Sequence, residues 1–119
     1  MTWRITDAGF AMTLTRDVPP AIRDHIGEFL AQEDAGAGSM RSCIVHPGGP
    51  GVLDAVESAL VLPSCAALDA ARDTLRRHGN MSSATILFVL DEALRRGCES
   101  PHTLLAFGPG LSMERLTIL

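Results

Sequence analysis

The sequence lacks the features that define several broad classes of protein. Acidic residues outnumber basic ones, with 14 Asp and Glu against 10 Lys and Arg, and the formal net charge is −4. Such a balance provides no basic surface for nucleic acid or for an anionic membrane. The longest largely apolar stretch, residues 84–90, is far shorter than the roughly 20 residues that span a bilayer. We therefore expect a protein that binds neither nucleic acid nor membranes.

Cysteines are few, and their spacing shows no pairing pattern. Cys43, Cys65 and Cys98 are an odd number at irregular intervals, and the sequence contains no CxxC motif. There is also no secretory leader at Met1. These features predict reduced thiols in the cytoplasm rather than a disulfide framework.

Histidines at metal-ligand spacing are also lacking. His25, His78 and His102 do not combine with another His or Cys in a recognised ligand pattern. Solvated or capping roles are expected for these three side chains, and no metal site is predicted.

What the sequence does contain is a regular alternation of strand and helix patterns within 119 residues, which is enough for one domain over residues 1–119. Period-two alternation and short apolar runs predict strands, and apolar stripes at helical spacing predict helices. The expected class is layered α/β with a mixed sheet. The predicted strands are 3–6, 10–14, 42–46, 103–107 and 111–119, and the predicted helices are 18–30, 52–60, 64–75 and 82–96.

The predicted helix Ser82–Arg96 is unusual because apolar residues surround it on every side before the charged residues at its end. We expect it to be a largely buried central helix. In a lone small domain one of its sides would face water and mark an interface, either with a missing partner region or with another copy of the chain.

Three short segments contain the residues most capable of chemistry. They are HPGGP from His46, GNMSS from Gly79 and FGPG from Phe107, and each is rich in small residues at the end of a predicted element. Bare backbone at such places allows a ligand to approach closely. An imidazole and a carboxamide can together polarise a carbonyl, so His46 and Asn80 are candidate catalytic residues if the fold brings them together.

Each of the two residues also has a purely structural interpretation. A histidine at the end of a strand is often structural, and Asn80 could simply cap the next helix together with Ser82 and Ser83. The spacing of these residues does not decide between the two interpretations.

Taken in order, these segments resemble the C-terminal half of the type III polyketide synthases, the chalcone and stilbene synthase family. The stretches HPGGPGVLDAVESAL, GNMSSATILFVLDE and LAFGPGLSMERL are similar to that family's motifs almost residue for residue, and DAGFAMTLTRDVP is similar to the stretch before them. The resemblance implies the C-terminal half of a thiolase-like fold, with the cysteine-bearing N-terminal half outside these residues. It also implies a cytoplasmic homodimer that needs no cofactor and takes CoA thioesters as substrates.

The same resemblance implies a decarboxylative condensation of malonyl-CoA with a CoA-linked starter acyl group. His46 would keep the nucleophilic cysteine as a thiolate and, with Asn80, would bind the thioester carbonyl. Fixed donors at this position stabilise the negative charge that loss of carbon dioxide generates. Gly49 and Gly51 would offer backbone to the pantetheine arm of CoA, and the cavity would be lined by Ser82, Phe107 and Pro109.

The chain departs from the family pattern in three respects, of which the first is Trp3, at a position where the family has small residues that allow longer products. The usual gating phenylalanine falls on Met12, a softer side chain that changes the aperture or shape of the cavity. None of the cysteines lies in a motif that matches the family's nucleophile. Cys43 is near His46 in sequence, but residues three apart on a strand point to opposite faces, so Cys43 is expected to be a buried, inert thiol. The chain alone is therefore expected to be inactive.

Two other functions remain open. The chain could be a stand-alone, non-catalytic remnant that acts as an assembly or regulatory partner. A hydrolase that uses His46 with Ser82 or Ser83 is a third interpretation, although no carboxylate is placed to orient the imidazole and GNMSS is not a nucleophile elbow.

Overall fold

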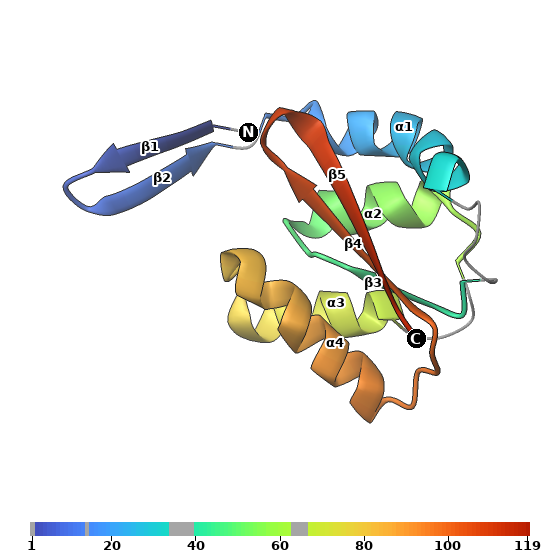
Figure 1. The fold of residues 1–119 in the computed structure, drawn as a ribbon. Helices are drawn as coiled ribbons and strands as arrows, with labels where there is room; N and C mark the ends of the chain where they lie inside the picture. The colour runs from blue at the N-terminus through green and yellow to red at the C-terminus, as the bar shows by residue number, and fades with distance from the viewer. Residues whose placement is uncertain (1, 14, 34–39, 63–66) are drawn as a thin grey trace.

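The chain folds as an α/β structure with a separate hairpin at its N-terminal end (Figure 1). The computed structural model describes residues 2–13, 15–33, 40–62 and 67–119. Within them the strands are β1 (Thr2–Thr6), β2 (Gly9–Thr13), β3 (Ser42–Val45), β4 (His102–Gly108) and β5 (Ser112–Ile118). The α-helices are α1 (Val18–Glu33), α2 (Pro50–Ala59), α3 (Ala67–His78) and α4 (Thr85–Arg95).

Three strands form the mixed sheet that the sequence pattern predicts. β3 pairs with β4 in parallel, with Val45 opposite Leu105, and β4 pairs with β5 antiparallel. Helices α1 and α2 lie on one side of this sheet, and α3 and α4 lie on the other (Figure 1). Parallel pairing requires a crossover between the two strands, and α2, α3 and α4 supply it. The carboxyl ends of β3 and β4 therefore meet at one edge of the sheet.

The β1–β2 hairpin extends away from the helices and the three-stranded sheet (Figure 1). Its strands pair antiparallel from Thr2 opposite Thr13 to Thr6 opposite Gly9, which confirms the predicted hairpin. Gly9 has a φ of 116°, a conformation that side-chain-bearing residues rarely adopt, and the Thr6 hydroxyl donates a hydrogen bond to its carbonyl at 2.8 Å. The turn is therefore specified locally.

The hydrophobic core lies between the sheet and its helices. Every residue of β3 is buried; α3 and α4 pack against this strand, and α1 and α2 lie on the other side of the sheet (Figure 1). Aliphatic side chains dominate the core, as the apolar stripes of the sequence indicate. Its fully buried large members include Ile22, Ile26, Ile44, Leu53, Val56, Val89 and Leu105.

The helix expected over residues 82–96 begins with a short 3₁₀ turn at Ser82–Ala84, continues as α4 and is buried on one face only. Thr85, Val89 and Ala93 are its buried residues, whereas the side chains of Leu87 and Leu94 are 62% and 51% exposed. The expectation of a largely buried helix is therefore wrong within this chain. The described residues of the chain supply packing partners for the face turned toward the sheet and leave the opposite apolar face open.

Two expectations about cysteine and histidine are corrected by the structure. Cys98 is buried and disulfide-bonded, so the predicted reduced thiol is wrong there, because spacing along a chain does not report which sulfurs meet in space. Cys65 lies outside the described residues. His102 is neither solvated nor a cap: it is 5% exposed, and its Nδ1 lies 3.1 Å from the Ser42 hydroxyl across the β3–β4 pair.

No helix among the described residues is long and apolar enough to cross a membrane.

Candidate functional site

His46 follows β3 directly and is held by the sheet. Its backbone N–H donates to the carbonyl of Leu105 at 2.8 Å, which extends the β3–β4 ladder one residue beyond the strand. The imidazole is half-buried, and burial lowers its pKa below the usual value. The ring is therefore neutral at pH 7, with one nitrogen able to donate a hydrogen bond and the other able to accept one.

Of the two glycines Gly49 and Gly51 in the segment after His46, the packing of the helices requires only the second. A Cβ added at Gly51 would lie 3.3 Å from Cγ of Pro19, so this glycine allows α2 to begin close against α1. At Gly49 the φ is 174°, which any residue can adopt, and an added Cβ would meet no described atom within 4 Å. Neither the backbone conformation nor the packing requires a glycine at position 49. The space that a side chain would occupy there is open and lies beside the loop.

Asn80 lies against this loop, although the two segments are far apart in the sequence. Gly79 ends α3 with a φ of 71°, the left-handed conformation typical of a residue after a helix. The Asn80 carboxamide then donates from Nδ2 to the carbonyl of Gly48 at 3.3 Å, across 32 residues of sequence. The fold thus brings the GNMSS and HPGGP segments together, which periodicity alone did not show.

The oxygen of the same carboxamide is bonded on the opposite side. Asn80 Oδ1 accepts the backbone N–H of Ser82 at 2.9 Å and lies 3.5 Å from the hydroxyl of Thr85. That hydroxyl in turn accepts the N–H of Met81 at 2.7 Å. Sequence analysis did not identify Thr85, although it is the only hydroxyl-bearing residue within the otherwise apolar run 84–90.

Phe107 and Pro109 lie at the same edge of the sheet as His46, because β4 runs parallel to β3 and ends beside it. Phe107 is half-buried and Pro109 is exposed. Ser82, the third predicted cavity residue, is exposed beside Asn80. The side chain of Met12 lies outside the described residues, so its predicted effect on the cavity stays a prediction.

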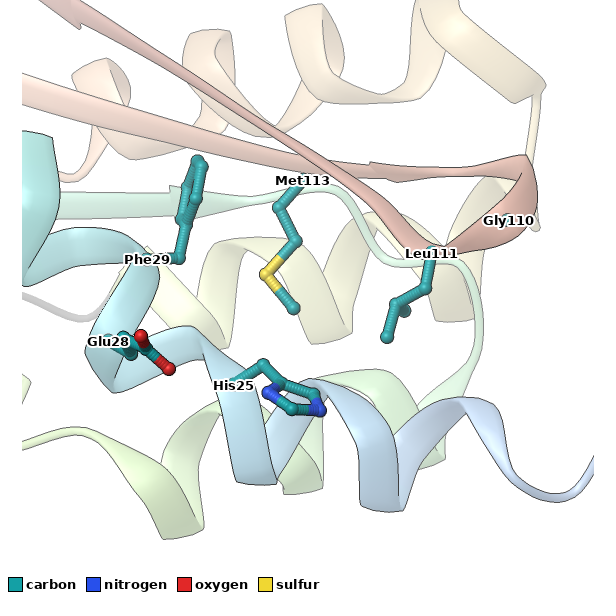
Figure 2. Close-up of a pocket in the computed structure, with 6 residues that line it drawn as sticks. All are labelled: His25, Glu28, Phe29, Gly110, Leu111 and Met113. Atoms are coloured by element: carbon teal, nitrogen blue, oxygen red, sulfur yellow. The ribbon is translucent and has the colours of Figure 1, made fainter.

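A hollow of about 390 Å³ lies near the end of β4, and the residues that line it are drawn in Figure 2. It is formed between α1 and the turn from β4 to β5, and its lining includes no residue of HPGGP or GNMSS. Figure 2 shows side chains of α1 facing those that follow the turn. The lining residues are His25, Glu28, Phe29, Gly110, Leu111 and Met113.

Cys43 matches the expectation of an inert thiol. It is free, its side chain is 2% exposed, and burial raises its pKa to about 12. A thiol with such a pKa is almost entirely protonated at neutral pH and is a poor nucleophile. The described part of the chain also contains no cluster of three or more metal-binding side chains.

Solved structures with the same arrangement of elements define the class of protein. The C-terminal type III polyketide synthase domain of Steely1, a type I/III hybrid from Dictyostelium, matches 98% of this chain with a TM-score of 0.77 and 28% identity. PKS-I from the brown alga Ectocarpus siliculosus matches 98% of the chain with a TM-score of 0.81 and 25% identity. The chain thus has the fold found in type III polyketide synthases, which is thiolase-like.

The sequence comparison identifies the family. The profile described as "Chalcone and stilbene synthases, C-terminal domain" matches residues 1–119, so the chain belongs to this family. It is 40% identical over 119 residues to the 1,3,6,8-tetrahydroxynaphthalene synthase of Streptomyces peucetius subsp. caesius. That match covers 94% of this chain and 31% of the Streptomyces protein. The chain therefore spans about a third of the length of this relative, and 35% and 34% of the two structures.

Proposed function

We propose that the chain is the C-terminal part of a type III polyketide synthase that condenses malonyl-CoA with a CoA-linked starter acyl group. His46 and Asn80 are its catalytic residues, and the nucleophilic cysteine is supplied by an N-terminal region outside these residues. No cofactor is needed besides the CoA thioester substrates. The protein acts in the cytoplasm as a homodimer.

The observation that carries this proposal is the hydrogen bond from Asn80 to the carbonyl of Gly48. It joins the segment containing the asparagine to the loop that follows His46, at the sheet edge where β4 also ends. One of the two N–H groups on Nδ2 makes this bond, and the second is left to bind a substrate oxygen. An imidazole and a carboxamide at the same edge of the sheet can both donate hydrogen bonds to a carbonyl oxygen that gains negative charge.

Decarboxylative condensation requires hydrogen-bond donors beside the thioester oxygen of malonyl-CoA. Breaking the bond between the carboxyl carbon and the methylene carbon of malonyl-CoA releases carbon dioxide and leaves an enolate, whose charge resides largely on the thioester oxygen. The enolate carbon then attacks the starter carbonyl on the cysteine, forming a carbon–carbon bond as the cysteine sulfur leaves as a thiolate. Preorganised hydrogen-bond donors aimed at the charged oxygen lower the barrier without reorganisation.

The protonation state of His46 depends on the partner cysteine. Burial in this chain favours the neutral ring, but a nearby thiolate favours the protonated ring and raises its pKa. The cysteine would therefore be stabilised as a thiolate by the same imidazole that donates to the carbonyl. The open space beside Gly49 supports close approach of the extended pantetheine arm to the backbone of this loop.

The test is the rate of condensation by the natural full-length protein, supplied with malonyl-CoA and acyl-CoA starters. Replacing His46 or Asn80 with Ala is expected to lower kcat by about a hundredfold or more, as removal of an oxyanion donor does in other enzymes. Arg41→Ala, at an exposed ion pair with Glu99, is the control and is expected to leave kcat unchanged. Near-normal turnover by both active-site variants would contradict the assigned roles.

A further inference from the structure

We infer that Thr85 is a positioning residue for Asn80: its hydroxyl fixes the turn and the carboxamide so that Nδ2, not Oδ1, faces the HPGGP loop. The structural part of this inference stands on hydrogen-bond geometry alone. Its consequence for catalysis rests on the proposed function of Asn80.

The donors and acceptors around Asn80 allow only one orientation of its carboxamide. The backbone N–H of Ser82 can only donate, so the atom 2.9 Å from it must be the oxygen. The carbonyl of Gly48 can only accept, so the atom 3.3 Å from it must be the nitrogen. Turning the carboxamide over would place two acceptors together on one side and two donors together on the other.

Thr85 reinforces this orientation with a single hydroxyl. The oxygen accepts the N–H of Met81 at 2.7 Å, so its own proton is directed elsewhere, and Asn80 Oδ1 lies 3.5 Å away as an acceptor. The side chain of Thr85 is fully buried at the start of α4. Its position is set by the packing of the helix, so the hydroxyl is a fixed reference for an exposed asparagine.

The turn between the two residues needs such an anchor. Ser82 has a φ of 60°, in the left-handed region that residues other than glycine seldom occupy. Residues in this region are retained when surrounding contacts over-determine the backbone. The bonds from Met81 to Thr85 and from Ser82 to Asn80 are those contacts, because they hold the backbone N–H groups of both Met81 and Ser82.

Orientation decides what Asn80 can do to a substrate. With Nδ2 toward the loop, its free N–H donates to a thioester oxygen and stabilises negative charge there. With Oδ1 toward the loop, the same side chain would repel that oxygen. Turning the carboxamide over at this position therefore changes a stabilising group into a destabilising one.

The structural test compares crystal structures of the full-length protein with Thr85→Val, which keeps the shape and removes the hydroxyl, and with Thr85→Ser, which keeps the hydroxyl. We expect Thr85→Val to lose the Asn80–Gly48 contact and to relax the φ of Ser82, and Thr85→Ser to retain both. Thr74→Val, at a second buried threonine on α3 that makes none of these bonds, is the matched control. An unchanged Asn80 in Thr85→Val would overturn the inference.

The catalytic test is a double-mutant cycle on kcat with Asn80→Ala. We expect Thr85→Val to lower kcat about tenfold, Thr85→Ser to restore most of it, and Thr85→Val to cause no further loss when Asn80 is already Ala. Equal losses in both backgrounds would overturn the positioning role. If Asn80→Ala itself leaves kcat unchanged, the proposed function of Asn80 fails, and the crystal structures still decide whether Thr85 positions it.

Discussion

At the scale of single residues, the site depends on neighbours that hold each functional group in one state. Burial keeps His46 neutral, the Gly48 carbonyl and the Ser82 amide orient Asn80, and the anchor for that turn is Thr85. His46 and Asn80 could be chosen as candidates from the sequence because their segments are short and distinctive, and the structure brings those two segments into contact. Thr85 could not, since its role depends on a turn whose geometry appears only when α4 is packed against the sheet.

The lowered pKa of His46 has a consequence for stability at acid pH. As the pH falls below 6.5, the ordinary histidine value, the unfolded chain takes up a proton before the folded chain does. Protonation of His46 therefore does not change the free energy of unfolding above that pH, and it lowers this free energy progressively below it. His46→Gln removes this dependence.

Urea unfolding of both proteins at about pH 7.5 and about pH 5.5 measures the effect. We expect the free energy of unfolding to fall more for the natural protein than for His46→Gln between the two conditions. An identical fall in both proteins would show that the His46 pKa is the same in the folded and unfolded states.

At the scale of secondary-structure elements, α2 and α3 are joined by a charged clamp on the surface. Arg72 Nη2 of α3 lies 2.8 Å from the Asp54 carboxylate and 2.7 Å from the Glu57 carboxylate of α2. The HPGGP segment leads into α2, and the GNMSS segment follows the end of α3. The clamp therefore connects the elements that place the two halves of the site, but its charges are largely exposed.

Arg72→Gln tests how much the clamp contributes. Exposed ion pairs contribute little, so we expect a loss of at most about 1 kcal/mol in the free energy of unfolding, which disappears at high salt. Leu53→Ala, at a fully buried position of α2, is expected to cost about 3 kcal/mol. A larger loss for Arg72→Gln than for Leu53→Ala would show that the ion pairs, rather than the core, hold α2 in place.

The elements themselves were largely predictable, because each has a strong local signal. The strands and helices begin and end near the predicted residues, as Gly9, Pro50 and Gly79 illustrate at three of the boundaries. What could not be predicted was the pairing of distant segments. His102 was expected to be solvated or to act as a cap because it flanks a loop in the sequence, and only the parallel β3–β4 register places it against Ser42 in the interior.

At the scale of the whole molecule, the open face of α4 is the feature most in need of a partner. Leu87 and Leu94 are exposed two helical turns apart, opposite the buried Val89, and Phe88 is 47% exposed beside them. The apolar pattern of the sequence indicated a helix that must be covered all round, which these described residues do not achieve.

Sedimentation velocity of the chain at increasing concentration tests this surface. We expect self-association that grows with concentration, because burying the α4 face removes apolar area from water. Leu87→Gln should weaken the association, whereas Arg23→Gln, at an exposed position of α1, should not. A single monomeric species at high concentration would contradict the expected interface.

The most direct test of the central claim is the release of carbon dioxide from carboxyl-labelled malonyl-CoA by the full-length protein, because this step forms the enolate that His46 and Asn80 would stabilise. We predict that Asn80→Ala slows the release by about a hundredfold or more while malonyl-CoA still binds. Release at the natural rate in that variant would show that Asn80 does not stabilise the enolate, and the assignment of the condensing site to this edge of the sheet would be wrong.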